Sequence, residues 1–302
     1  MDLQQFFEPV NVGRFAESKQ FPEDTIGHSI KIHDKADVPG LKSNDLVIVG
    51  IKSSPEDDAA DWIRKYFYNL KMENTGIDLI DGGDYVLDKD DEQKVNELAF
   101  AFSEIIDAGA CVLIIGGSQE TTYIQYLAYE SLKQLANLVL IDAKADISTK
   151  EVNHLTPDTY LQQILLRDPS YLFNLSLLGY QHYFVGNQLT DALKEMYFDL
   201  HRLGQARDNM KAIEPVIRNG NFVSFDTGSI RQSDAPGNNH PTPNGFYGEE
   251  ACLLARFAGL SKGISSCGYY EYNPAFDNNG QTAHLIAQLL WHFMDGYISR
   301  VD

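Results

Sequence analysis

Leu46-Val47-Ile48-Val49-Gly50-Ile51 is a continuous apolar run, typical of a strand that is buried on both faces of a parallel sheet. A helical pattern follows it, because residues 57–70 carry apolar side chains such as Ile63 and Phe67 at helical spacing. A buried strand followed by an amphipathic helix is the repeating unit of α/β proteins. This part of the chain therefore predicts a parallel sheet covered by helices.

The same alternation continues toward the carboxyl terminus. Further strands are predicted at 77–80, 111–115, 138–141, 175–178, 182–185, 222–225 and 263–270. Further helices are predicted at 92–106, 120–135, 190–202, 207–218, 246–258 and 281–298. The pattern predicts a three-layer α/β/α domain with a mostly parallel sheet of about eight strands. Residues 1–302 form one domain in this interpretation, with residues 1–45 as an irregular N-terminal arm.

Composition supports one large core. The chain has 302 residues, of which 43% are hydrophobic and 11% aromatic. No stretch is long and apolar enough to cross a membrane, and the first residues lack the pattern of a secretory signal. We therefore expect a cytoplasmic protein. The three cysteines, Cys111, Cys252 and Cys267, lie in apolar surroundings without metal-finger spacing, which favours buried, reduced thiols.

The net charge is strongly negative, −19 with histidine neutral. Such a chain repels phosphate backbones and anionic bilayers, so neither nucleic acid nor a membrane is expected as a partner. The charge is spread along the whole chain, which is typical of a solvated surface. An acidic surface also tolerates cationic ligands.

Acidic or amide side chains follow three of the predicted strands. The segments are Ile115 to Glu120, Ile141 to Asp146 and Val223 to Gly228. Ligands of parallel α/β sheets bind beyond the carboxyl ends of the strands. The sequence therefore predicts a site where these three segments meet.

Four motifs carry a resemblance to a known family. They read GGSQE (116–120), DAKAD (142–146), SFDTG (224–228) and EYNPAFD (271–277), with Thr282-Ala283 after the last. In order and approximate spacing they resemble the ureohydrolases, which include arginases, agmatinases and formimidoylglutamases and have the signatures GGDHS, DAHxD, SxDxD and ExNPxxD. The resemblance covers roughly residues 46–300. It implies an arginase-like fold and a homo-oligomer, either a trimer or a hexamer. Residues 160–165 and 177–181 look more like formimidoylglutamases than arginases.

The departures from these signatures fall on metal-ligand positions. In the family, two Mn²⁺ ions share a hydroxide that attacks a guanidinium or formimino carbon. The resemblance assigns the first ion to the positions of Gln119, Asp142, Asp146 and Asp226. It assigns the second ion to the positions of Asp142, Lys144, Asp226 and Gly228. Gln119, Lys144 and Gly228 replace a histidine, a histidine and an aspartate, so three of six positions are substituted.

Lys144 changes the charge of the expected site. A protonated ammonium cannot ligate a metal, and neighbouring carboxylates keep it protonated. We expect Lys144 to neutralise the site in place of the second cation. Two alternatives remain for the cofactor. Either one Mn²⁺ or Mg²⁺ is held weakly by the four first-ion positions, or no metal is bound; retained family activity would require two Mn²⁺.

Two residues are candidates for catalysis. Glu271 matches the family glutamate that contacts the guanidinium or formimino nitrogens of the substrate. The alternative is that its motif serves as a turn, with Asp277 capping the last helix. His154 follows the second motif, where arginases carry a proton-shuttling histidine, but its surroundings do not match, and a surface position is the alternative. His240, in the loop 228–245, is open to the same two interpretations. The Asp81-Gly82-Gly83-Asp84 segment is predicted to be a turn after a strand.

Three functions are compatible with this sequence. The first is a ureohydrolase-fold protein with a degraded metal site that binds or senses a small cationic molecule with a guanidino or formimino group. The second is an active hydrolase of linear amidines with a mononuclear or atypical site. The third is a structural partner of an active paralogue.

Overall fold

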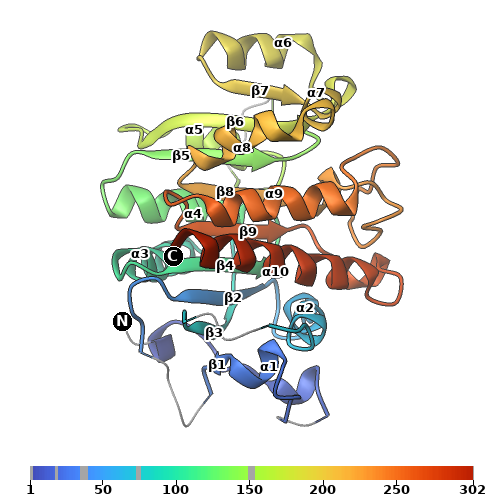
Figure 1. Cartoon of the computed structure of the whole chain (residues 1–302). Helices are drawn as coiled ribbons and strands as arrows, with labels where there is room; N and C mark the ends of the chain where they lie inside the picture. Colours follow the sequence, from blue (N-terminus) through green and yellow to red (C-terminus); the bar gives the residue numbers. More distant parts are fainter. Residues whose placement is uncertain (1–2, 18–19, 35–39, 73–75, 149–153, 302) are drawn as a thin grey trace.

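The computed structural model describes residues 3–17, 20–34, 40–72, 76–148 and 154–301. Within them, one sheet has nine strands in the order β1-β3-β2-β4-β9-β8-β5-β6-β7 (Figure 1). Every neighbouring pair of strands is parallel. The predicted α/β architecture is therefore confirmed, with one strand more than expected. None of the described helices is long and apolar enough to span a membrane.

The elements have the following bounds. The strands are β1 Lys31–Ile32, β2 Leu46–Lys52, β3 Leu79–Val86, β4 Cys111–Gly116, β5 Ala136–Ile141, β6 Leu172–Tyr180, β7 Asp199–Arg202, β8 Phe222–Asp226 and β9 Ser266–Tyr270. The helices are α1 Ile26–Ser29, α2 Ala59–Phe67, α3 Glu92–Asp107, α4 Thr121–Ser131, α5 Tyr160–Leu165, α6 His182–Glu195, α7 Leu203–Asp208, α8 Met210–Arg218, α9 Gly248–Leu260 and α10 Gln281–Val301. The arm 1–45 is mostly irregular, but its strand β1 joins the sheet beside β3.

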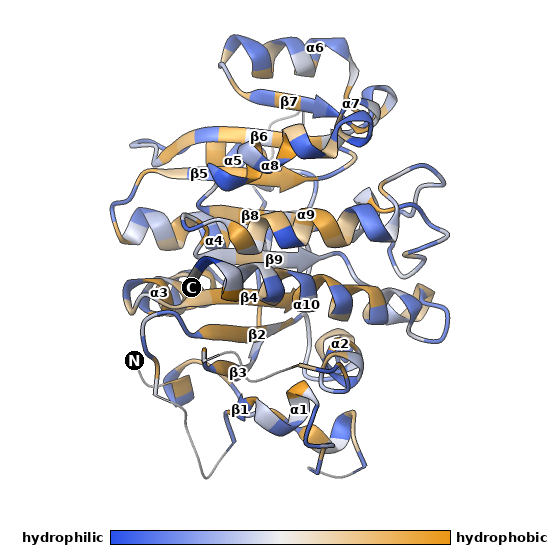
Figure 2. Ribbon diagram, viewed as in Figure 1, coloured by the Kyte–Doolittle hydropathy of each residue, from blue (hydrophilic) through white to orange (hydrophobic). Residues whose placement is uncertain are grey.

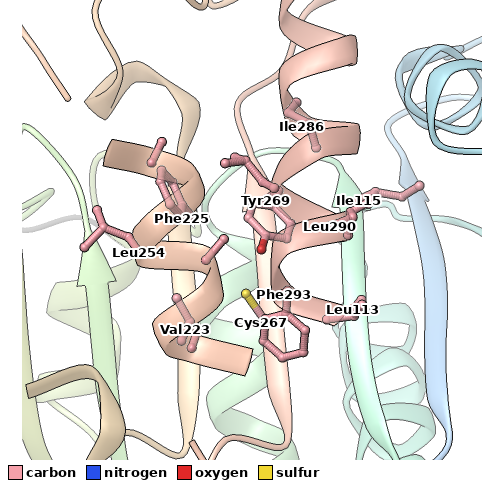
Figure 3. Close-up of a cluster of buried hydrophobic side chains, with 14 of the residues drawn as sticks. Leu113, Ile115, Val223, Phe225, Leu254, Cys267, Tyr269, Ile286, Leu290 and Phe293 are labelled. Carbon is pink, nitrogen blue, oxygen red and sulfur yellow. The ribbon is translucent and has the colours of Figure 1, made fainter. Parts of the chain in front are cut away.

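Alternate side chains of each central strand pack into two separate cores. Leu113 and Ile115 of β4 belong to the core under α9 and α10, whereas Val112 and Ile114 belong to the core under α3 and α4. Figure 3 shows the first core, in which side chains of β4, β8, β9, α9 and α10 interlock. The strands β2, β4 and β8 are correspondingly apolar along most of their length (Figure 2). The three cysteines lie buried as free thiols, as predicted.

The structure corrects the prediction for residues 182–202. His182 to Val185 does not form a strand, because α6 begins at His182, and β7 occupies the end of the predicted helix 190–202. A short apolar run does not distinguish a strand from a helix. Residues 199–202 form strand β7 because they pair with β6. Ser176 lies opposite Asp199, and the Asn174 amide donates to the Asp199 carboxylate at 2.8 Å.

The predicted turn at Asp81 to Asp84 lies within β3 and is also corrected. Its two aspartates are buried against Arg64 of α2, which donates to Asp81 at 2.7 and 2.9 Å and to Asp84 at 2.6 Å. Lys52 lies 2.7 Å from Asp84. Burial opposes ionisation, but the charges of Arg64 and Lys52 outweigh it and lower the pKa of Asp84. A strand tolerates both carboxylates here because buried cations balance them.

Replacing Arg64 tests how far this ion cluster stabilises the fold. Arg64→Met leaves two buried carboxylates with one cation fewer, so we expect the free energy of unfolding to fall by about 3 to 5 kcal/mol. Urea denaturation at pH 7 measures the change. Lys71→Met is the control, because its pair with Asp24 is exposed to solvent and is expected to contribute little to stability. Equal effects of the two substitutions would contradict this role.

Candidate functional site

The site lies where four adjacent central strands end. Strands β4, β9, β8 and β5 are consecutive in the sheet and parallel, so their carboxyl ends share one edge. Gln119 follows β4, Glu271 follows β9, Asp226 ends β8 and Asp142 follows β5. The sheet order thus brings together residues that are up to 152 positions apart in the chain.

A pocket of about 360 Å³ opens at this edge. The structure places in its lining every predicted site residue except His154: Gln119, Asp142, Lys144, Asp146, Asp226, Gly228 and Glu271. His154 is exposed and does not line the pocket. His240 does line it. Sequence reasoning missed several other lining residues, namely Pro157, Asp158, Phe184, Asn238, Pro241, Thr242 and Pro243.

Two glycines turn the chain from β4 into the site. Gly116 and Gly117 have φ values of 76° and 73°, and a Cβ on Gly116 would lie 2.9 Å from the Ile51 carbonyl oxygen. The turn brings the Gln119 backbone N–H to 2.8 Å from Glu271 Oε1. Glu271 itself has a φ of 65°, which is a strained conformation for a residue with a side chain and is common at functional sites.

Both carboxylate oxygens of Asp142 accept hydrogen bonds within the protein. The Lys144 backbone N–H donates to Oδ1 at 2.8 Å, and the Gln119 side-chain amide donates to Oδ2 at 3.0 Å. The Asp142 side chain has no solvent exposure. Burial, and then the nearby charge of Asp146, raise its pKa well above the ordinary value.

Asp226 and Asn238 occupy the region around Gly228. Asp226 Oδ1 accepts the Gly228 N–H at 2.7 Å, and the Asn238 amide nitrogen lies 3.1 Å from Thr227 Oγ1 and 3.4 Å from Asp226 Oδ1. A Cβ on Gly228 would lie 3.1 Å from Asp226 Oδ2 and 3.2 Å from the Asn238 amide nitrogen. A side chain at position 228 would therefore meet both a carboxylate and the Asn238 amide.

Comparison with known proteins decides the ancestry of this site. A sequence model of the arginase family matches residues 52–295. The chain belongs to the arginase family. The motifs that suggested this relationship are the segments that line the pocket, so the predicted family is confirmed.

Formimidoylglutamases recur among the similar arginase-family proteins. A formimidoylglutamase of Staphylococcus aureus is 28% identical over 256 residues, which cover 82% of this chain and 79% of that protein. The structure of Bacillus subtilis formimidoylglutamase matches with a TM-score of 0.79 and 20% identity, over 94% of this chain and 95% of the other. Trypanosoma cruzi formiminoglutamase with Mn²⁺ matches with a TM-score of 0.78 and 18% identity, over 91% and 99% of the two chains. These structures show the same arginase-like fold.

Four carboxyl groups of this arginase-family pocket, those of Asp142, Asp146, Asp226 and Glu271, carry raised pKa values. Burial, with a contribution from the charge of Asp226, raises the pKa of Asp146 to about 7 and that of Glu271 to about 8. Burial, and then the charge of Asp142, also raise the pKa of Asp226 well above its ordinary value. Lys144 lowers the pKa values of Asp146, Asp226 and Glu271, yet no described carboxylate oxygen lies within 4.0 Å of its ammonium. Lys144 therefore acts on these groups through longer-range attraction.

One further polar group lies beside these carboxyls. The Tyr160 side chain of α5 is fully buried, and its hydroxyl has no hydrogen-bond partner among the described residues. Burial, and then the charges of Asp146, Asp142, Asp226 and Glu271, raise its pKa. This hydroxyl supplies an unused donor and acceptor near the base of the site.

The described residues do not form a ready metal centre. No group of three or more His, Cys, Asp or Glu side chains in the described ranges is arranged to hold a metal ion. The Lys144 ammonium has no lone pair to offer, and both Asp142 oxygens accept N–H donors. On the other side of the site, Asp277 does cap α10, accepting from the Thr282 and Ala283 N–H groups, as predicted.

Replacing Asp146 tests the raised pKa values. A half-buried carboxyl whose pKa is raised to about 7 in the folded state destabilises that state when it ionises. The stability that its protonated form contributes is therefore lost as the pH rises from about 4 to about 7. Asp146→Asn removes this pH-dependent loss of stability, because asparagine does not ionise. In chelator-treated protein, we expect the variant to gain roughly 2 to 4 kcal/mol of unfolding free energy relative to wild type between pH 4 and pH 8.

Urea denaturation across this pH range measures the effect. Asp158→Asn is the matched control, because Asp158 lines the same pocket but is exposed. A difference between the Asp146 variant and wild type that does not change with pH would refute the shifted pKa.

Proposed function

We propose that this arginase-family protein binds a small organic cation in the acidic pocket and does not perform two-manganese hydrolysis. The observation that carries the proposal is the set of residues at the metal-ligand positions. Gln119, Lys144 and Gly228 stand where the family has two histidines and an aspartate. Two of the three replacements are accommodated by their neighbours, because Gln119 donates a hydrogen bond to Asp142 and Gly228 adjoins Asn238.

The second ion position is the less suited of the two to a metal. Its private ligands would be Lys144, which is a cation, and Gly228, which has no side chain. Asn238 points its amide nitrogen, a hydrogen-bond donor, at Asp226 and Thr227. These residues do not fit a bridging pair of Mn²⁺ ions, so we derive no hydrolytic step through such a pair.

The first ion position retains three carboxylates and an amide. If they moved together around an ion, Asp142, Asp146, Asp226 and the Gln119 oxygen would supply an all-oxygen set, which suits Mg²⁺ or Mn²⁺ better than Zn²⁺. A cation there would compete with the Lys144 charge, whose repulsion is several kcal/mol at ~4 Å and an effective dielectric of ~20. We therefore propose that at most one cation binds, and weakly.

The charge of the pocket favours an organic cation as the ligand. Five carboxyl groups line it, those of Asp142, Asp146, Asp158, Asp226 and Glu271, against one lysine. Planar amidinium and guanidinium groups match carboxylates in a bidentate geometry. Glu271, held by the Gln119 N–H, is the candidate contact for such a group. The names of the formimidoylglutamase relatives are consistent with a formimino group as one such head.

Metal binding tests the proposal directly. We expect purified wild-type protein to retain fewer than about one Mn²⁺ per chain after dialysis against Mn²⁺, and to release neither urea nor formamide from amidine substrates. Metal analysis and a formamide assay with formimidoylglutamate measure the two properties. Two Mn²⁺ per chain together with turnover would overturn the proposal.

A variant with the family ligands restored is the positive control. Gln119→His, Lys144→His and Gly228→Asp replace the missing ligands, and Asn238→Gly makes room beside position 228. We expect this variant to bind Mn²⁺ at least tenfold more tightly than wild type, measured by calorimetry. Failure to gain any Mn²⁺ affinity in a folded variant would contradict the assignment of these positions to the ancestral metal site.

A further inference from the structure

The pocket is lined by apolar side chains as well as by carboxyl groups. Phe184 and three prolines, Pro157, Pro241 and Pro243, line the pocket together with the carboxyl groups. Phe184 is 48% exposed, and its neighbour Tyr183 is 67% exposed. Their rings lie edge to face, with centroids 4.7 Å apart. A pocket that combines carboxylates with exposed aromatic and apolar side chains suits a cation attached to a hydrocarbon stem.

The aromatic pair is held in place by the loop 228–245. Asn244 donates to the Tyr183 hydroxyl at 3.3 Å, and the Tyr183 hydroxyl donates to Gln181. Gln181 is buried and donates in turn to the Asn244 carbonyl oxygen at 2.8 Å. These bonds connect the start of α6 to the loop that also supplies Asn238 and His240. Phe184 is therefore presented to the pocket on an anchored segment.

The lining also limits what the far end of a ligand can carry. No arginine lines the pocket within the described residues, and Lys144 and His240 are the basic side chains there. A ligand carboxylate would be placed among five carboxyl groups with few donors to receive it. Like charges in such a site disfavour binding. This composition does not favour a glutamate-like tail.

We propose that the pocket selects organic cations that lack a carboxylate, with the cationic head among Asp146, Asp226 and Glu271 and the hydrocarbon stem against Phe184. This inference rests on the proposed cation-binding function and assigns its ligand class. Phe184 is the residue that determines specificity for the stem.

Three guanidines with different ends test the selectivity. Calorimetry with full-length protein at pH 8 and constant ionic strength compares n-butylguanidine, 4-guanidinobutylamine and 4-guanidinobutanoate. We expect the first two to bind at least tenfold more tightly than the butanoate. Equal or tighter binding of the butanoate would overturn the selectivity while leaving the cation-binding function intact. Failure of all three to bind at millimolar concentration would overturn the proposed function, and this inference with it.

A variant at Phe184 tests the stem contact. Phe184→Ala is expected to weaken n-butylguanidine about tenfold and to leave methylguanidine, which has no stem, unchanged. Phe173→Ala is the control, because Phe173 is 70% exposed on β6 and does not line the pocket. Circular dichroism checks that both variants fold. Unchanged affinity of the Phe184 variant for n-butylguanidine, or an equal loss for both guanidines, would overturn the role of Phe184.

Discussion

Buried carboxyl groups that share a pocket repel one another unless protons or positive charges balance them. In this protein the parallel order of β4, β9, β8 and β5 forces that situation, because all four strands end at one edge with Gln119, Glu271, Asp226 and Asp142 beyond them. Burial, and then repulsion between neighbouring carboxyl groups, raises the pKa values of Asp142, Asp146, Asp226 and Glu271. In our account, the three substituted positions reduce the dependence of this edge on metal ions. Gly228 removes a carboxylate, Lys144 adds a positive charge, and Gln119 gives Asp142 a hydrogen bond.

A second group of buried charges in the same protein shows the contrasting case. Asp81 and Asp84 lie in the interior of β3, but Arg64 and Lys52 approach them within 3 Å. The pKa of Asp84 is lowered, whereas that of Asp142 is raised. The direct ion pairs with Arg64 and Lys52 give Asp81 and Asp84 a role in stabilising the fold. Among the described residues, Lys144 attracts the edge carboxyls without a direct ion pair, so these carboxyls are available to a cationic ligand.

The sequence predicted most of the fold, because buried strands and amphipathic helices leave strong local patterns. The apolar run of β2 and the acidic segment after β5 are examples. It did not predict that His182 to Val185 begins a helix, because a short apolar run has no clear period. It did not predict β7 at Asp199–Arg202 either, because only pairing with β6 makes that segment a strand. Asp81 and Asp84 looked like turn residues because their partner Arg64 is 17 and 20 positions away. Asn238 and Phe184 reach the pocket from a loop and a helix start, where no pattern marks them. His154 lies outside it because nearness to a motif in sequence does not place a side chain in the pocket.

The central claim concerns the charge of the pocket. Without a ligand, bound protons and the Lys144 ammonium offset the negative charge of the carboxyl groups. An organic cation that binds displaces those protons. Calorimetry of n-butylguanidine with chelator-treated protein at pH 7, repeated in buffers of different ionisation enthalpy, measures the protons released on binding. The account predicts release of about one proton per cation bound, with an affinity that added Mn²⁺ does not improve. Binding that appears only after Mn²⁺ is added, with no proton release in its absence, would contradict it.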